Sequence, residues 1–218
     1  MQAGYFAGTH SLPSPSSVNP MKKTFVLSLL VGAVALPTGL EAQEPDLSAC
    51  WLRGSTVAEA QAKASPLGAV AIPLGDDVAQ LCYSRPSANG REVAGNLIPF
   101  GEPWRMGANE PTQLHLPAAA QVGGVDLDPG VYSLYVVAQE DEWEIVINSA
   151  YERWGIPINA QVRASDVGSV TRPVEETDEF VEMFTVEWDS HGDAMGHLVM
   201  EWENAHVELP IHAGGMSH

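Results

Sequence analysis

Short stretches in which apolar and polar residues alternate are the feature that most constrains how this chain can fold. Alternation puts every second side chain on the same face of an extended strand. Turn-forming Gly, Pro, Asn and Asp residues separate the stretches at intervals of about 8–12 residues, and they recur until almost the end of the chain. We therefore predict an all-β fold, an antiparallel β-sandwich or jelly-roll-like single domain with a short N-terminal helix. Strands do not alternate with helices, which argues against a doubly wound or TIM-barrel architecture.

Local signals place the first elements. Thr56 and Glu59 have the spacing of a helix capping box, so a short helix is predicted over residues 56–64. Residues 67–74 and 78–84 flank the turn Gly75-Asp76-Asp77 and predict a β-hairpin. The later predicted strands are 112–116, 143–149, 158–167, 180–188, 197–204 and 205–211.

Three finer expectations follow from the second half of the chain. In residues 158–167 the apolar residues alternate, which predicts a strand. The acidic runs 139–144 and 175–180 could supply paired carboxylates for glycoside hydrolysis, but we interpret them as solvated turns. Trp188 and Trp202 occupy similar positions in adjacent predicted strands and are expected to pair across the sheet.

The chain begins with segments that do not belong to the folded domain. Met21-Lys22-Lys23 precede the apolar run 25–36, and Leu40-Glu41-Ala42 offer a cleavage site, so residues 21–42 are predicted to be a signal peptide. The apolar run is shorter than the roughly 20 residues that span a bilayer. We expect an exported protein, periplasmic or extracellular, that does not span a membrane after signal removal. Residues 1–20 are expected to be a non-native or disordered extension.

The remaining chain divides into three predicted parts: a linker with a short helix at 43–64, the β-sandwich domain at 65–212 and a disordered tail at 213–218. The protein is strongly acidic, with 28 Asp and Glu residues against 10 Lys and Arg residues and a net charge of −18. Such a surface repels nucleic acid and anionic lipid, so neither is expected as a partner.

Cys50 and Cys82 are the only cysteines of the sequence. An even pair in an exported chain predicts a disulfide. Residues 47–50 also resemble the acylation site of bacterial lipoproteins, but acidic residues separate them from the apolar run. A reactive or metal-binding thiol pair is the third alternative, and no CxxC spacing supports it.

The arginine segment, residues 85–105, concentrates three arginines in this acid-rich chain, inside the long Gly- and Pro-rich loop 83–110. Guanidinium groups suit carboxylates, phosphates and hydroxyl groups, and an indole ring can stack on a sugar. The predicted ligand-binding residues are Arg85, Arg91, Trp104, Arg105, Asn109 and Glu110. The same arginines could instead satisfy the backbone carbonyls of the loop, and this structural alternative stays open.

No metal site or cofactor is predicted. Five histidines and Asp193 lie in the last 28 residues, and His191 and His197 stand at opposite ends of one predicted turn. Two ligands do not make a metal site, which needs three or four. His115 alternates with leucines and is expected on the polar side of its strand. The sequence contains no GxSxG, HExxH, P-loop or GxGxxG motif.

Two neighbouring motifs, YSRPSANGR at 83–91 and IPFGEPWRMGANEPT at 98–112, resemble the bacterial family known as domain of unknown function 2911. The residues that match its pattern are Tyr83, Arg85, Pro86, Ser87, Gly90, Arg91, Pro99, Gly101, Trp104, Arg105, Gly107, Ala108, Asn109 and Glu110. Asn89 departs from it, because a basic residue is frequent there. The resemblance covers about 65–211 and implies an exported, mostly-β domain, without an activity, cofactor or substrate.

We therefore expect a domain whose loop 83–110 binds a polar small molecule or a glycan. One alternative is a hydrolase in which Glu110 is the general acid or base and Arg85 and Arg105 stabilise charge. Another is a purely structural module of the cell envelope. Whether the protein is an enzyme is left open by the sequence.

Overall fold

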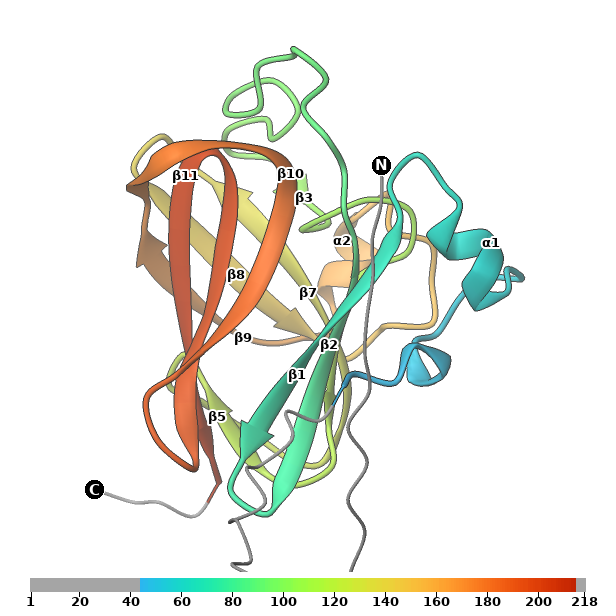
Figure 1. Cartoon of the computed structure of the whole chain (residues 1–218), viewed down its shortest axis with the longest axis vertical. Helices are drawn as coiled ribbons and strands as arrows, with labels where there is room; N and C mark the ends of the chain where they lie inside the picture. Colours follow the sequence, from blue (N-terminus) through green and yellow to red (C-terminus); the bar gives the residue numbers. More distant parts are fainter. Residues whose placement is uncertain (1–43, 215–218) are drawn as a thin grey trace, which may run out of the picture. The chain divides into compact units, whose positions relative to one another are not determined.

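Two antiparallel β-sheets pack face to face in this protein, as the computed structural model of residues 44–214 shows (Figure 1). Eleven strands and three short helical segments make up the described part of the chain. Strands account for 53% of the described residues and helix for 7%, so the predicted all-β sandwich is confirmed.

The first sheet has seven strands, in the order β1-β2-β4-β7-β8-β9 with β3 paired to β7. The strands are β1 (Leu67–Leu74), β2 (Asp77–Ser84), β3 (Pro103–Trp104), β4 (Thr112–Leu116), β7 (Gly130–Ala138), β8 (Glu142–Asn148) and β9 (Asp166–Pro173). β1 and β2 pair with Leu74 opposite Asp77, which confirms the predicted hairpin.

The second sheet has the order β10-β11-β5-β6. Its strands are β5 (Ala120–Val122), β6 (Val125–Leu127), β10 (Glu175–Ser190) and β11 (Met195–Ala213). The edge of β10 that faces away from β11 is covered by the loop that follows β2, because the amide of Ala88 donates to the carbonyl of Glu182 and that of Phe184 to Pro86. A covered edge does not offer a template for pairing with another chain.

β11 turns back on itself near Glu203, whose φ angle of 59° lies in the left-handed region. His197 and Glu208 are 11 residues apart, yet His197 Nδ1 lies 2.6 Å from Glu208 Oε2. A straight strand would separate two such residues by about 36 Å. The halves 195–203 and 204–213 therefore lie side by side, as Figure 1 shows. The two strands predicted at 197–204 and 205–211 are one continuous strand that bends at this point.

β10 crosses over the turn of β11. Glu175, at its start, pairs with His206 in the second half of β11, whereas Ser190, at its end, pairs with Gly196 in the first half. Register shifts on both sides of Val181 accommodate the crossing. The prediction that 175–180 is a turn is therefore wrong: these residues belong to β10.

The core lies between the inner faces of the two sheets. In β8 Trp143, Ile145 and Ile147 lie on the inner face, whereas Glu144 and the buried Val146 lie on the outer face. Leu198, Met200, Trp202, Val207, Leu209 and Ile211 supply the corresponding face of β11. Each such side chain contributes about 1.5–3 kcal/mol by leaving water.

Residues 44–64, here called the strap, cover part of the outer face of the first sheet. The strap contains the 3-10 helix η1 (Leu47–Ala49) and the helix α1 (Val57–Gln61). The capping box is formed: Thr56 Oγ1 accepts from the Glu59 amide, and the Glu59 carboxylate accepts from the Thr56 amide at 2.8 Å. The predicted N-terminal helix is thus confirmed, three residues shorter at its C-terminal end.

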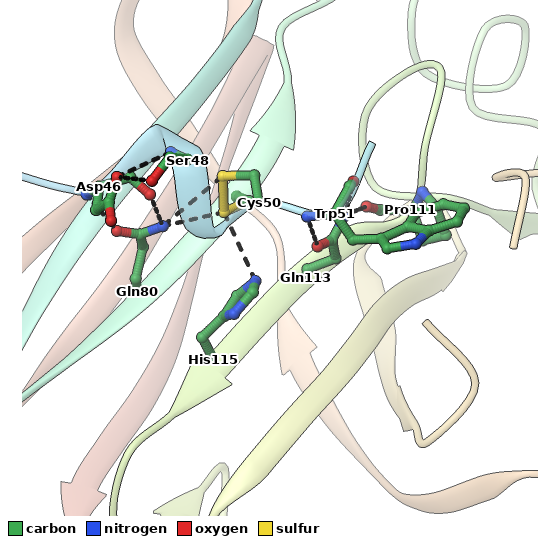
Figure 2. Close-up of a disulfide and its surroundings, with 9 residues drawn as sticks. Asp46, Ser48, Cys50, Trp51, Gln80, Pro111, Gln113 and His115 are labelled. Atoms are coloured by element: carbon green, nitrogen blue, oxygen red, sulfur yellow. Dashed lines mark hydrogen bonds between the residues drawn. A yellow bond between two sulfur atoms is a disulfide. The ribbon is translucent and has the colours of Figure 1, made fainter. Parts of the chain in front are cut away.

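A disulfide joins the strap to β2, which confirms the predicted Cys50–Cys82 pair. Cys50 therefore has no free thiol for acylation or metal binding. Gln113 of β4 reinforces the attachment, since its side chain accepts from the Trp51 amide and donates to the Trp51 carbonyl, both at 2.9 Å (Figure 2). Cys50, Ala60, Leu67 and Cys82 form a small second core beneath the strap.

Two further expectations are corrected. Residues 160–163 form the helix α2 (Ala160–Arg163) rather than a strand, because Asn159 Oδ1 accepts from the amides of Gln161 and Val162 and caps a helical turn. Trp188 and Trp202 do not pair: Trp188 lies opposite Leu198, and Trp202 points into the core.

The predicted signal peptide 21–42 and the preceding residues 1–20 lie outside the described residues, as do residues 215–218 of the predicted tail. Export and the domain boundaries therefore stay predictions. Between Glu44 and Gly214, no helix is long and apolar enough to cross a membrane.

Candidate functional site

The loop that carries the two motifs bridges the two sheets. It leaves the first sheet at Ser84 and runs beside β10, where Ser87 pairs with Met183. Tyr83 links the sheets at the same place, since its hydroxyl accepts from the Val186 amide at 2.9 Å. The chain then returns to the first sheet as β3. The motif YSRPSANGR thus holds the sandwich together along one edge.

Each guanidinium group of the arginine segment contacts a different part of the chain. Arg85 donates to the Thr185 hydroxyl of β10 at 3.3 Å, and its Nε is buried without a hydrogen-bond partner. Arg91 donates at 2.9 Å to the carbonyls of Ser87 and Ala88 in its own loop. The first contact ties the loop to the second sheet, and the others close the turn.

Arg105 packs under the loop that follows β8. A side chain at Gly155 would meet Arg105 Cδ at 2.5 Å and would also collide with the backbone of Asn109, so only glycine fits there. Burial lowers the pKa of the Arg105 guanidinium, and its Nε has no hydrogen-bond partner. Arg105 Nε and Arg85 Nε are thus two buried donors without a partner among the predicted residues.

Trp104 is part of the core. Its side chain is 7% exposed and stacks on Trp202 at 5.7 Å, with the edges of Trp143 and Phe184 against it. The ring therefore links a strand of the first sheet to β11 of the second. It has no free face for a sugar, and its position favours a structural role.

Asn109 and Glu110 also contact other parts of the protein. The Asn109 side chain donates to the carbonyl of Ser65 at 3.1 Å, in a left-handed conformation with φ of 60°. Glu110 is 5% exposed, and its carboxylate accepts from the Arg53 amide and from Lys63 Nζ, at 3.3 and 3.4 Å. Glu110 thus holds the strap. Burial and internal partners favour structural roles, and ligand binding by the six residues stays a prediction.

Histidines and carboxylates gather on the outer face of β10 and β11. His206 Nδ1 lies 2.8 Å from Glu201, and Glu208 contacts both His197 and His206. The rings of His191 and His197 are 4.3 Å apart. Within residues 44–214, no group of three or more His, Cys, Asp or Glu residues is arranged to hold a metal ion.

This histidine–carboxylate cluster has a defined electrostatic state. The hydrogen bond with Glu201 raises the pKa of His206 above its ordinary value of 6.5. Burial opposes ionisation of Glu208, but its bonds to His197 and His206 prevail and lower its pKa below the ordinary value of 4.5. Arg172 and Glu175 line the same hollow as His206 and Glu208.

We expect the substitution His206→Gln to lower stability most between pH 4.5 and 6.5. A raised histidine pKa gives stability that is complete below pH 6.5 and is lost as the pH rises through the folded-state value. A lowered glutamate pKa gives stability that is lost as the pH falls below 4.5. Urea unfolding of both proteins at about pH 5.5 and 8.5 measures the effect. An equal difference at the two pH values would contradict it.

A cavity of about 330 Å³ lies at the end of the sandwich where β11 turns back. Its walls come from four segments: 93–100 of the loop, 138–143 between β7 and β8, 174–176 at the start of β10, and 202–205. Trp143 and Trp202, 3% and 2% exposed, line it, and we call it the Trp pocket. Phe100, 43% exposed, also lines the pocket. None of the six predicted ligand-binding residues lines it.

Glu203 fastens the loop over the Trp pocket. Its carboxylate accepts from the amides of Val93 and Ala94 at 3.3 and 3.4 Å. A left-handed glutamate costs about 1–2 kcal/mol, and such strain gathers at functional sites. The strained residue thus stands where the loop, the turn of β11 and the pocket meet.

A second hollow, of about 570 Å³, lies between the strap and the first sheet. It is lined by Trp51, Tyr151 and His115, whose Nε2 lies 3.7 Å from Cys82 Sγ (Figure 2). Burial lowers the pKa of His115, and no Asp, Glu, Lys or Arg lines the hollow. It lacks a charged group to orient a ligand, so the Trp pocket is the better candidate site.

Sequence reasoning missed the Trp pocket because its walls come from four separate turns. The acidic runs 139–144 and 175–180 are visible in the sequence, but each alone is typical of a solvated turn. The pairing of β9 with β8 sets Pro173 opposite Glu142 and lets the Val174 amide donate to the Asp141 carbonyl at 2.9 Å. This pairing brings Glu175 and Glu176 to the same end of the sandwich as Glu140.

A family model described as "Protein of unknown function (DUF2911)" matches residues 65–211. The match includes both motifs of the loop and confirms the resemblance seen in the sequence. No curated protein matches the chain, and no solved structure does either.

Proposed function

Because the chain belongs to the DUF2911 family, whose description assigns no activity, we propose its function from the site alone: it binds a small organic molecule in the Trp pocket. One observation carries the proposal, the cavity of about 330 Å³ with two tryptophans in its walls. This volume is at the small end of the usual range for ligand sites, about 300–1,000 Å³.

The loop 83–110 still takes part in ligand binding in this proposal, but through other residues than those predicted from the sequence. Segment 93–100 contacts the ligand, whereas Arg85, Arg91 and the neighbouring motif hold that segment between the sheets. A site built from residues on rigid strands and a fastened loop needs little ordering when a ligand binds. The hydrolase alternative is less favoured, because the Glu110 carboxylate is buried and bonded to Lys63 and Arg53.

Nuclear magnetic resonance of the ¹⁵N-labelled protein tests the proposal. Mixtures of small aromatic alcohols, amines and carboxylates are titrated in, and backbone amide shifts are followed. We expect the shifts to concentrate at Ala94, Phe100, Gln139 and Asn204, which line the pocket. The substitution Ala94→Trp fills the cavity and should abolish them, whereas Ala58→Trp, on the exposed face of α1, should not.

The outcome separates the functions that the chain could have. Shifts centred on the backbone amides of Arg85 and Arg105 would overturn the Trp pocket and support the arginine segment as the site. The absence of shifts with every mixture would overturn ligand binding and favour a purely structural module of the envelope.

A further inference from the structure

The Trp pocket carries charge of one sign. Glu140, Asp141, Glu175, Glu176 and Glu203 line it, and no Lys, Arg or His residue does. Glu203 is bonded to the loop, but the other four carboxylates take part in no ion pair within residues 44–214. Glu175 also lines the neighbouring hollow, together with Arg172 and His206. Glu140, Asp141 and Glu176 share their pocket with no cationic side chain, and they attract a cation that enters it.

The aromatic part of the pocket also favours a cation. Trp143 and Trp202 line the interior but are only 3% and 2% exposed, whereas Phe100 lines the pocket with a ring that is 43% exposed. The face of an aromatic ring attracts an ammonium or guanidinium group, and among these three rings that of Phe100 is the accessible one. The same rings, with Ile98 and Val174, give an apolar surface for the uncharged part of a ligand.

The whole protein adds to this preference. With a net charge of −18, it attracts cations from solution and repels anions before any contact forms. The volume of about 330 Å³ limits the ligand to a small molecule.

We propose, on the basis of the proposed function, that the ligand of the Trp pocket is a small organic cation. An ammonium or amidinium group lies among the carboxylates of Glu140, Asp141, Glu175 and Glu176. An apolar body about the size of a benzene ring contacts Trp143, Trp202 and Phe100. The charge fixes the orientation of the ligand, and the rings supply the apolar contact.

Calorimetric titration with three probes of nearly equal size tests the charge preference: benzylamine, benzyl alcohol and benzoate. We expect benzylamine to bind about ten-fold more tightly than benzyl alcohol, and benzoate to be the weakest. The affinity for benzylamine should fall as salt is added, because partly exposed carboxylates are screened. The affinity for benzyl alcohol should not change with salt.

Matched variants locate the effect. The double substitution Glu175→Gln and Glu176→Gln should weaken benzylamine binding about five-fold and leave benzyl alcohol unaffected. Asp178→Asn with Glu179→Gln removes the same charge from the same strand outside the pocket, and should leave both unaffected. Phe100→Ala should weaken both probes, whereas Phe180→Ala, at an exposed ring outside the pocket, should weaken neither.

The results distinguish a failure of this inference from a failure of the proposed function. If benzyl alcohol binds as tightly as benzylamine and Phe100→Ala weakens both, the pocket is a binding site and the cation preference is wrong. If no probe binds and no fragment shifts the pocket amides, both are wrong. If a lysine-containing tetrapeptide binds more tightly than benzylamine, the partner is a protein and the small-molecule inference is overturned.

Discussion

Replacing Trp104 with alanine is expected to lower the free energy of unfolding by about 3–5 kcal/mol. The side chain is 7% exposed, and its ring lies among Trp143, Phe184 and Trp202 at centroid distances of 5.2–5.8 Å. Deleting the ring therefore leaves a cavity between the two sheets and removes three aromatic contacts. Urea unfolding followed by circular dichroism measures the loss.

Trp154 is the matched control. Its ring is 37% exposed, on the loop after β8, so Trp154→Ala should cost much less than Trp104→Ala. If Trp104→Ala does not fold at all, Trp104→Phe gives a smaller measurable loss, because it keeps one ring in the cluster. A loss below about 1 kcal/mol for Trp104→Ala would show that the ring is not a core residue and would restore the ligand-stacking hypothesis.

Breaking the Cys50–Cys82 disulfide is expected to cost roughly 3.5–4 kcal/mol of stability, the chain-entropy value for a loop of this size. The two residues are 32 positions apart, and the bond fixes the strap to β2. The double variant Cys50→Ala and Cys82→Ala, compared with the oxidised parent in urea unfolding, gives the value. The strap should also open locally, so trypsin should cleave after Arg53, which is exposed, faster than in the parent.

Reducing agent provides the control for the disulfide. It should lower the unfolding midpoint of the parent and leave that of the double variant unchanged. An unchanged parent midpoint would mean that Glu110, Gln113 and the small core beneath the strap hold it without the covalent bond.

Local patterns were sufficient for much of the fold. The hairpin of β1 and β2 follows from two alternating stretches around a Gly-Asp-Asp turn, and the capping box at Thr56 follows from the spacing of two residues. These signals depend on residues close in sequence, so no knowledge of the rest of the fold is needed. The disulfide followed because the sequence offers only one pair of cysteines.

Predictions were wrong where a local sequence pattern was compatible with two different structures. Residues 158–167 alternate as a strand does, but Asn159 can cap a helix, and the segment becomes α2 before β9 begins at Asp166. Trp188 and Trp202 have similar positions in their predicted strands. The turn at Glu203 and the register of β10 nevertheless place the Trp202 ring against that of Trp104 and not against Trp188. A register is set by contacts across the whole sheet and not by one strand.

The candidate site shows the same division. The sequence by itself determined that loop 83–110 is the distinctive part of the chain, that the fold is an all-β sandwich and that the strap is covalently attached. Only the tertiary structure decided that Trp104 and Glu110 are buried, and that four separate turns enclose the Trp pocket. The physical reason is that alternation, capping and cysteine pairing are encoded locally, whereas burial and convergence depend on which distant strands pack together.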